Sequence, residues 1–317
     1  MNQANELYLD WGKEILEDGF LVSTRGTVSK EEIASFSKLD LNEPLVVTLA
    51  GRKLSPSYVI EEFKWYMSGS TRAADISHAA PFWDSLKDDD GDVVSNYGYW
   101  LFYDEAFWSK DKYISRFDNC VDILVKDPSS RKAIINIHGV DNSTLNPMDT
   151  PCTLSLQFLI RNDKLYMIVN MRSNDLVLGW CNDILQFQFI AWMMAAVLKH
   201  RFHGFKNLEL GEYIHFAGSL HVYDRHFGKL EFTDEKEVQF HSPAALNFQK
   251  NLAAALKNIM ENDFPVEETE NLEWLKAYIV PLIVKAERQT KAGPKEINFV
   301  QGESLVQHGA FPFDEGV

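Results

Sequence analysis

Apolar residues recur at helical spacing along the chain, most clearly in the segment that begins at Pro56. One face of this segment carries four apolar residues, Val59, Ile60, Phe63 and Met67. Pro56 suits the first turn of a helix, and Gly69 suits its left-handed end. The pattern therefore predicts a helix that carries Glu62 among apolar neighbours. Similar spacing predicts helices over residues 6–16, 113–125, 182–200, 244–260 and 272–288, the last with a kink at Pro281.

Alternation of apolar and polar residues predicts strands between these helices. A loose alternation after Arg25 predicts a strand that ends near residues 46–49, and other strands are expected over 133–137, 153–160, 165–172 and 208–215. Asn162 and Asp163 suit a tight turn, so the strands on either side of them should form a hairpin. Residues 88–92 read as an acidic loop, and because the loop lacks the glutamate that closes a calcium site, water is its expected partner.

The stretch 182–200 is apolar on nearly all sides, which predicts a helix buried in the middle of the fold. A membrane span is the competing interpretation. Asp183, Gln186 and Gln188 would each be costly in hydrocarbon, and the length is marginal for a span. The sequence therefore favours a core helix.

Together these elements predict an α/β (α+β) fold, with residues 1–317 forming a single domain. The sequence shows no internal repeat and no linker rich in glycine, serine or proline. The core is expected over about residues 20–230, followed by a helical elaboration over about residues 240–317. The sequence predicts no function for this helical elaboration.

Composition narrows the classes of partner. With 317 residues, 45% of them hydrophobic, the chain can bury a full core. A formal charge of -15 disfavours binding to a long nucleic acid, although a few local arginines suffice for one nucleotide. Three cysteines without paired spacing argue against a disulfide framework or a zinc ribbon, and the N-terminus lacks the pattern of a signal peptide. A cytoplasmic protein without a metal or a membrane partner is the expectation.

Cys152 is the first residue that suggests chemistry. A lone cysteine at a strand edge is more often a small buried hydrophobe than a nucleophile. Here, however, Arg172 follows one hairpin later and could favour the thiolate if it lies close to Cys152. A thiolate that adds to C6 of a pyrimidine makes C5 nucleophilic. A buried Glu62 would have a raised pKa suited to proton transfer.

Several ordered motifs resemble the thymidylate synthase superfamily, over roughly residues 25–223. The motifs are Glu62 with Trp65 and Gly69, Trp83-Asp84 with Tyr97-Gly98, Asp127-Pro128 with Ser130-Arg131-Lys132, Pro151-Cys152 with Gln157-Phe158, Arg172-Ser173 with Asp175 and Gly179, and His221 with Tyr223. Taken one at a time, each has an ordinary structural interpretation, such as core packing for the tryptophans and solvated charge for Arg131 and Lys132. Their agreement in order makes the resemblance specific.

The resemblance implies a three-layer fold, a homodimer with the mixed sheet at the subunit contact, and 5,10-methylenetetrahydrofolate as the cofactor. It also implies roles for individual residues. The expected phosphate contacts are Arg25, Arg172 and Ser173, joined by Arg131 and Lys132 from the facing subunit, although a lysine lacks the fork geometry of arginine. The expected sugar contacts are His221 and Tyr223, the pterin contacts are Trp83, Asp175 and Gly179, and Tyr97 adds a further substrate contact.

Asp183 departs from the pattern of members that act on uracil, which carry asparagine there. An ionised aspartate only accepts hydrogen bonds, so it suits the N4 amine and a protonated N3 of cytosine. Within the family this resembles the phage-type deoxycytidylate hydroxymethylases. Capping the start of helix 182–200 is the alternative role for Asp183. Thr153 and Ser219 also depart from the synthase pattern, which argues against a uracil-type water network.

The resemblance implies 5-hydroxymethylation of dCMP, with Cys152, Glu62 and Asp183 as the catalytic residues. Water adding to an exocyclic methylene gives the hydroxymethyl product, whereas hydride from the folate gives a methyl group. A dCMP methylase and an enzyme for CMP therefore stay open as alternatives. A cysteine hydrolase using Cys152 and His221, and a silent nucleotide-binding protein, are further readings. The hydrolase lacks any sequence sign of an oxyanion site, and a binder would need neither Cys152 nor Glu62.

Overall fold

The computed structural model describes residues 2–24, 26–104, 107–109, 112–139, 148–228 and 241–291. The helices are α1 (Gln3–Asp18), α2 (Pro56–Ser68), α3 (Ala74–Ser77), α4 (Arg116–Lys126), α6 (Cys181–Arg201), α7 (Pro243–Glu261), α8 (Asn271–Tyr278) and α9 (Val280–Lys291). The strands are β1 (Phe20–Thr24), β2 (Thr27–Asp40), β3 (Phe107–Ser109), β4 (Lys112–Ile114), β5 (Ile134–Asn136), β6 (Thr153–Arg161), β7 (Lys164–Met171), β8 (Asn174–Asp175) and β9 (Glu209–Tyr223).

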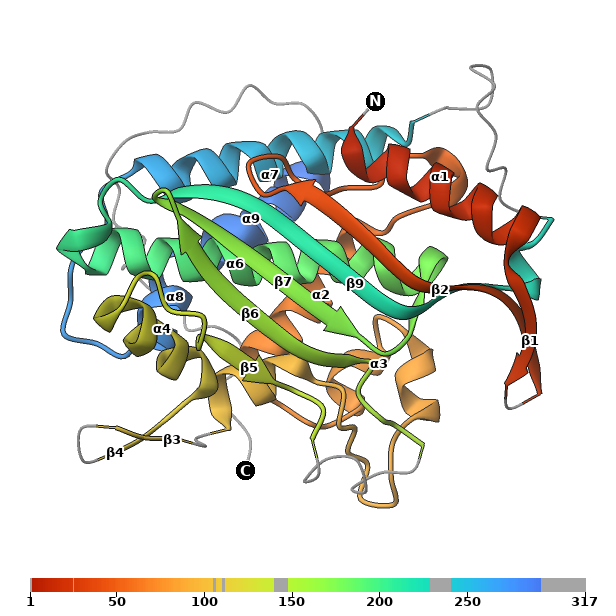
Figure 1. Cartoon of the computed structure of the whole chain (residues 1–317), viewed down its shortest axis with the longest axis horizontal. Helices are drawn as coiled ribbons and strands as arrows, with labels where there is room; N and C mark the ends of the chain where they lie inside the picture. Colours follow the sequence, from red (N-terminus) through yellow and green to blue (C-terminus); the bar gives the residue numbers. More distant parts are fainter. Residues whose placement is uncertain are drawn as a thin grey trace.

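The main sheet is mixed, in the order β1-β2-β9-β7-β6-β5, with β8 paired to β9 (Figure 1). β2 and β9 are antiparallel, and so are β6 and β7, whereas β7 and β9 run parallel. A parallel pair needs a crossover connection, which α6 supplies between β7 and β9. The expected mixed α/β architecture is confirmed.

Helix α6 lies at the centre of the molecule. It contacts β7 and β9 of the sheet, and it also contacts α2, α4, α7 and α8. The segment Leu176–Arg201 is long and apolar enough to cross a membrane by length and composition alone, but 94% of its most apolar window is buried inside the protein. The expected core helix is therefore present, with α2, α7 and α9 forming a further layer behind it (Figure 1).

Local sequence explains the elements that hold the site. Ser55 caps α2 by accepting a hydrogen bond from the backbone N–H of Tyr58, and Gly69 ends the helix at φ +69°. Asn162 and Asp163 both adopt positive φ, at 51° and 57°, as the tight turn between β6 and β7 requires. The predicted helix and hairpin are thus confirmed, together with the causes given for them.

Other expected boundaries are wrong. The strand after Arg25 ends at Asp40, so residues 46–49 lie outside it. Residues 112–114 form β4, and the helix expected from residue 113 begins at Arg116. The helix expected over 272–288, with a kink at Pro281, is interrupted at Ile279 and forms two helices, α8 and α9; the interruption lies two residues before Pro281. Strand β9 continues past residue 215 to Tyr223, which places His221 on the sheet.

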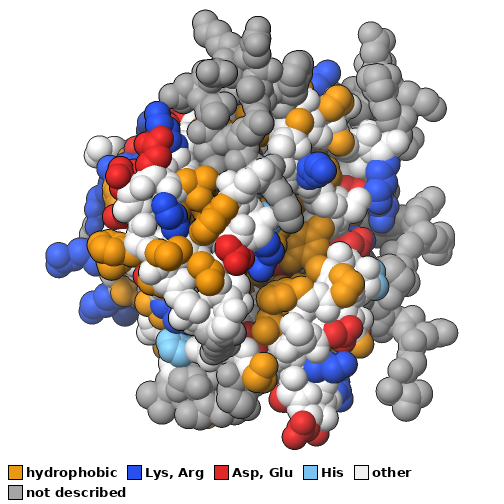
Figure 2. All heavy atoms as spheres, turned by 90° about the vertical axis from the view of Figure 1, so that its right-hand side faces the viewer, with side chains coloured by type: hydrophobic (Ala, Val, Ile, Leu, Met, Phe, Trp, Pro, Cys, Tyr) orange, Lys and Arg blue, Asp and Glu red, His pale blue; other side chains and the backbone are white. Residues whose placement is uncertain are grey.

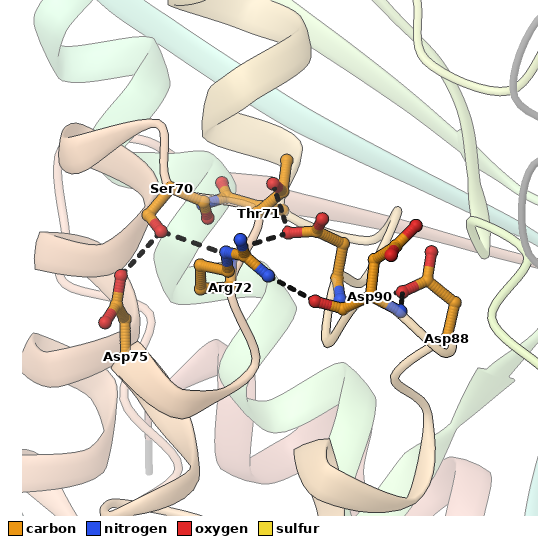
Figure 3. A network of polar contacts seen from close by, with 8 residues as sticks. Ser70, Thr71, Arg72, Asp75, Asp88 and Asp90 are labelled. Atoms are coloured by element: carbon orange, nitrogen blue, oxygen red, sulfur yellow. Dashed lines mark hydrogen bonds and ion pairs between the residues drawn. The ribbon is translucent and has the colours of Figure 1, made fainter.

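The acidic loop 88–92 is tied to the segment that follows α2 (Figure 3). Arg72 donates to the backbone carbonyl of Asp90 and pairs with the carboxylate of Asp92 at 3.6 Å. Thr71 donates to Asp92 at 2.8 Å, and Asp88 accepts from the backbone N–H of Asp90. Water is therefore not the only partner of this loop, contrary to the expectation from sequence.

The face of the sheet opposite α6 exposes apolar side chains. On β2, Phe36 is 52% exposed. Phe36 pairs across the ladder with Phe216, and Ile168 pairs with Ile214, so these partly exposed side chains continue the patch over β7 and β9. We call these four residues the outer sheet patch. A patch of this kind on a large sheet indicates an interaction surface.

Candidate active site

Cys152 lies directly before β6, at the end of the sheet where β7 finishes. Its backbone carbonyl accepts a hydrogen bond from the N–H of Arg172 at 2.8 Å. The Arg172 guanidinium donates to the carbonyls of Pro151 and Thr150, at 3.1 and 2.8 Å. The cysteine is partly buried, in contrast to the fully buried Cys120 and Cys181, and none of the three forms a disulfide. Hairpin β6–β7 thus brings Cys152 and Arg172 together, as the sequence predicts.

Figure 2 faces the end of the sheet at which β7 finishes and β6 begins, and shows hydrophobic side chains recessed near the centre of that face, with basic and acidic side chains close by. The other groups of the site reach this end from α2, β8, α6 and β9. A recessed apolar floor with a few charged groups is the usual form of a small-molecule site.

Glu62 projects from α2 into the core and is only 6% exposed. Its carboxylate accepts from the Tyr58 hydroxyl at 2.8 Å and from the Gln186 amide at 3.1 Å. Burial raises the pKa of Glu62 to about 7, although the two hydrogen bonds oppose the rise. A carboxyl with this pKa can hold or release a proton near neutral pH. The raised pKa expected from sequence is confirmed.

Asp183 lies in the first turn of α6, which begins at Cys181. Its side chain is only partly covered from solvent, yet surrounding protein atoms are close enough that burial raises its pKa well above the usual value. The nearby Glu62 carboxylate raises the pKa further, and a hydrogen bond with Asn174 lowers it. Trp180 occupies the residue before the helix and has no capping side chain, so the alternative role of Asp183 as the N-cap is wrong.

Tyr97 lies within electrostatic reach of both Cys152 and Asp183. Burial raises its pKa well above 10, and the charges of Cys152 and Asp183 add to the rise. Tyr66 packs on Tyr97 with ring centroids 5.7 Å apart. The structure therefore brings Cys152, Tyr97 and Asp183 into one electrostatic neighbourhood.

His221 and Asp175 meet where β8 pairs with β9. The Asp175 carboxylate accepts from the backbone N–H groups of Val177 and Leu178, and lies 3.8 Å from the guanidinium of Arg225. Burial lowers the pKa of His221, while the charge of Asp175 opposes the shift. A neutral imidazole at this position can both donate and accept a hydrogen bond.

Tyr223 stands beside His221 on the same strand, with ring centroids 4.8 Å apart and the rings edge to face. The Arg225 guanidinium lies over the Tyr223 ring at 4.4 Å from its centroid. Pairing with β2 places Glu31 opposite His221, and Glu31 accepts a hydrogen bond from Ser219 at 2.6 Å. Polar groups thus converge at this end of β9.

Trp83 is mostly buried, packs on Trp65 at a centroid distance of 4.9 Å, and points its indole N–H toward the Tyr58 hydroxyl at 3.4 Å. Through Tyr58 it is one contact from Glu62. Gly179 has no room for a side chain, because a Cβ there would lie 2.4 Å from Asn174 Oδ1 and 3.4 Å from Asp183 Oδ2. Glycine at 179 is thus a packing requirement of the Asp183 environment.

Some expected site residues are not brought to Cys152 within the chain. Arg131 and Lys132 are exposed and precede β5, and the Arg131 carbonyl accepts from Gln157, well along β6 from Cys152. Ser173 is partly exposed beside Arg172. Arg25 lies outside the described residues. No cluster of metal-ligating side chains occurs in the described ranges.

Sequence reasoning missed several groups that complete the site. Tyr58 lies one helical turn before Glu62, and this spacing could have identified it. Gln186 carried a signal as well, since a glutamine on an apolar helix needs a buried partner. Asn174, His215 and Tyr213 left no local signal, because strands distant in sequence bring them together.

The chain was compared with known proteins. The pattern of the thymidylate synthase family matches residues 6–280. Deoxycytidylate 5-hydroxymethyltransferase of Enterobacteria phage T4 is 32% identical over 229 residues, covering 71% of this chain and 87% of the phage protein, and the enzyme of phage T2 matches equally well. Thymidylate synthase of Bacillus subtilis subsp. natto is 29% identical over 255 residues, covering 77% and 87%.

The family match covers most of the chain, including every motif on which the resemblance was based. Relatives of both reaction types, hydroxymethyl transfer and thymidylate synthesis, lie at comparable similarity. The chain therefore belongs to the thymidylate synthase family, the folate-dependent transferases that act on pyrimidine nucleotides.

Proposed function

We propose that this protein transfers a one-carbon unit from 5,10-methylenetetrahydrofolate to C5 of dCMP and adds water, giving 5-hydroxymethyl-dCMP. The observation that carries the proposal is the carboxyl of Asp183, in the same electrostatic neighbourhood as Cys152 through Tyr97. Uracil presents an N3–H donor and an O4 acceptor, so a carboxylate leaves O4 without a donor. Cytosine with a protonated N3 presents two donors, which an ionised carboxylate accepts.

Cys152 is proposed as the nucleophile. Its thiolate would form a bond from sulfur to C6, while the electron pair of the C5–C6 double bond moves toward the N3 side of the ring. Protonation at N3 by Asp183 neutralises that charge, and C5 becomes the nucleophile. Methylenetetrahydrofolate, when bound, supplies the one-carbon unit that C5 attacks. Arg172 would support the thiolate through its position on the carbonyls before Cys152.

Glu62 is proposed to accept the proton lost from C5 and to accept a proton from the attacking water. Loss of the C5 hydrogen as a proton requires a base nearby, and attack of water on an exocyclic methylene requires a base to accept a proton from that water. A carboxyl with a pKa of about 7 serves both steps because it changes protonation state easily at neutral pH. Tyr58 and Gln186 fix its orientation.

The residues proposed for the cofactor suit a flat, partly apolar ring with N–H donors. Leu178 exposes 47% of its surface beside Gly179, so an apolar side chain there is available for a ring to cover. Asp175 supplies a carboxylate acceptor, and Trp83 supplies an aromatic edge close to Glu62. A pterin has this combination of faces. For the nucleotide, Arg172, Ser173 and Arg25 are proposed to bind the phosphate, and His221 and Tyr223 the sugar hydroxyl.

Product analysis tests the proposal. The full-length protein is incubated with dCMP and methylenetetrahydrofolate, and the nucleotide product is examined by mass spectrometry. A hydroxymethyl product is expected. A methyl product, which lacks one oxygen, would identify the rival dCMP methylase, and conversion of dUMP but not dCMP would refute the proposed substrate. A parallel reaction with CMP tests the ribonucleotide alternative.

Glu62→Gln is expected to lower the rate of product formation by about 10²–10⁴-fold, because the proton-transfer group is lost.

The free energy of unfolding of Glu62→Gln should not fall along with the rate at alkaline pH. A carboxyl with a raised folded-state pKa stabilises the fold only while it is protonated, so this contribution is lost as pH rises from about 4.5 to about 7. The variant should therefore be no less stable than the wild type at pH above about 7, and less sensitive to pH below it. Urea unfolding across pH checks this.

Glu61→Gln is the matched control, since Glu61 is the adjacent acid on α2 and pairs at the surface with Lys64 at 2.8 Å. It should keep both the rate and the pH dependence of stability. A large loss of stability in Glu62→Gln at alkaline pH would mean that Glu62 is structural, and the loss of activity would then carry no information about proton transfer.

We also propose that two copies of the chain associate through the outer sheet patch, and that Arg131 and Lys132 then reach the phosphate of the neighbouring site. Phe36→Asp should convert a dimer into a monomer, because a charge would be buried without a partner at the contact. Analytical ultracentrifugation measures this. Val266→Asp is the control, since Val266 is 67% exposed and lies outside the patch. An unchanged dimer in Phe36→Asp would refute the proposed contact.

A further inference from the structure

A buried row of polar side chains runs from β9 to Asp183. The Tyr213 hydroxyl lies 2.7 Å from Nδ1 of His215. Nε2 of His215 lies 3.1 Å from Nδ2 of Asn174. Asn174 Oδ1 and Asp183 Oδ2 both lie beside Gly179, where a Cβ would be 2.4 and 3.4 Å from them. Tyr213, His215 and Asn174 have at most 2% of their surface exposed, so bulk solvent does not reach them.

The imidazole in this row is neutral. Burial lowers the pKa of His215 to about 3, so it carries one N–H at physiological pH. A neutral imidazole is a donor at one nitrogen and an acceptor at the other. Because Tyr213 and Asn174 occupy the two sides, the tautomer of His215 sets the direction of every hydrogen bond in the row.

Asn174 shows which direction the row takes when Asp183 is protonated. Its Nδ2 faces His215 Nε2, and its Oδ1 is buried with no hydrogen-bond partner assigned among the described residues. The same oxygen faces the space beside Gly179, where Asp183 Oδ2 also points. A protonated Asp183 supplies the missing donor to Oδ1. In this direction Asp183 O–H donates to Asn174 Oδ1, and Asn174 Nδ2–H donates to His215 Nε2. His215 Nδ1–H then donates to the Tyr213 oxygen.

The opposite direction suits a charged Asp183. The amide of Asn174 turns by half a rotation, so that Nδ2 donates to the carboxylate and Oδ1 accepts from His215. His215 then carries its proton on Nε2 and accepts from the Tyr213 hydroxyl at Nδ1. One N–H bond is broken at Nδ1 and one is formed at Nε2, the ring double bonds shift, and the imidazole remains neutral. In both arrangements one hydrogen bond joins each residue of the row to the next, and in the first Asn174 Nδ2 also donates to Met171 Sδ at 3.1 Å.

We propose that Asn174, His215 and Tyr213 are positioning residues whose hydrogen bonds reverse direction with the protonation state of Asp183, so that this carboxyl can hold a proton and pass it to N3 of cytosine. The inference rests on the proposed function for its ligand, but the reversal itself is a property of the free protein. When the Asp183 O–H bond breaks and the N3–H bond forms, the reversed row stabilises the carboxylate that remains. The three residues therefore support selectivity for cytosine without touching the base.

The titration of Asp183 must be distinguished from the titration of the ionisable groups around it. In the part of the chain that the structure describes, seven ionisable groups interact electrostatically with Asp183: Glu62, Tyr58 and Tyr66 on α2, Tyr97, Asp175 on β8, Cys181 on α6 and Tyr213 on β9. Burial raises the pKa of Glu62 to about 7, so the titration of Glu62 falls near neutral pH. Glu62→Gln therefore serves as the background in which the titration of Asp183 is followed.

The first test is nitrogen NMR of the full-length protein labelled with ¹⁵N-histidine, with the His215 signals identified from their loss in His215→Gln. In the free protein, His215 should carry its proton on Nδ1 at low pH and on Nε2 at high pH, and should not become an imidazolium. The change should persist in Glu62→Gln and vanish in Asp183→Asn. A single tautomer throughout, or a change that persists in Asp183→Asn, overturns the proposal.

The second test is kinetic. Asn174→Ala should lower kcat/KM for dCMP by roughly ten- to a hundredfold, since buried partners are left unpaired, and should shift its pH profile. Tyr213→Phe removes a single hydroxyl and gives a milder variant should Asn174→Ala fail to fold, and it should shift the profile in the same sense. Asn5→Ala, which removes a buried amide bonded to Thr48, is the control and should leave the profile unchanged. An unshifted profile in both site variants overturns the proposal.

Failure of the proposed function looks different. If dCMP is not converted but the His215 tautomer still follows pH, the substrate assignment fails and the row stands. If dCMP is hydroxymethylated while the tautomer is fixed and both site variants keep the wild-type pH profile, the function stands and the row is only structural.

Discussion

Cys152→Ser is expected to abolish exchange of the C5 hydrogen of dCMP with solvent, by at least about 10³-fold, because the bond to C6 that acidifies this position can no longer form. A serine hydroxyl in the same place is a far weaker nucleophile at neutral pH. The measurement is release of tritium from [5-³H]dCMP, with and without the folate. Product formation should fall in parallel.

Cys120→Ala is the matched control for this substitution. Cys120 is a thiol buried in α4, with a pKa that burial raises to about 12, so it cannot act as a nucleophile. Its replacement should leave tritium release unchanged. Release that persists at the wild-type rate in Cys152→Ser would rule out the covalent mechanism, while wild-type binding of dCMP to that variant would show that the site itself is intact.

Asp183→Asn is expected to shift preference from dCMP toward dUMP by on the order of a few kcal/mol, since it replaces an acceptor-only group by one that also donates. The asparagine could donate to O4 of uracil and accept from its N3–H. At the same time it removes the group proposed to protonate N3 of cytosine. Titration of the protein with each nucleotide, in the absence of folate, measures the shift without depending on turnover.

Asp118→Asn provides the control for Asp183→Asn. Asp118 lies in the first turn of α4, as Asp183 lies in the first turn of α6, and it accepts hydrogen bonds from Ser115 and Asn271. Its substitution imposes a similar change of charge at a helix start and should leave nucleotide preference unaltered. Equal selectivity in Asp183→Asn and the wild type would refute the role assigned to this carboxyl.

Sequence patterns predicted the elements whose stability is local. Helix α2, hairpin β6–β7 and the core helix α6 each follow from apolar spacing, a cap or a turn within a short segment. The strand expected to reach residues 46–49 failed because those residues are buried by tertiary packing while outside a ladder, and burial leaves the same apolar signature as a strand. The boundary near residue 113 failed for another reason, since residues 112–114 pair with β3.

For the site, the sequence indicated the groups but not their surroundings. Glu62 was expected to have a raised pKa, and burial raises it. Asp183 had two interpretations, and only the position of the helix start separated them. The row behind Asp183 could not be predicted, because pairing of β8 with β9 and of β7 with β9 is required to bring Asn174 to His215. Residue type alone gives no sign of such contacts.

The pairing of β2 with β9 has a consequence for how the protein is made. Ser29 lies opposite Tyr223, and Asp40 lies opposite Glu212, so the partners are on the order of 180 residues apart. At about 5–20 residues per second, a ribosome needs roughly 10–40 seconds to synthesise that interval. During this time the edge of β2 that pairs with β9 has no partner. The nascent N-terminal third is therefore the stage of synthesis most open to aggregation, and the stage at which a chaperone has the most to protect.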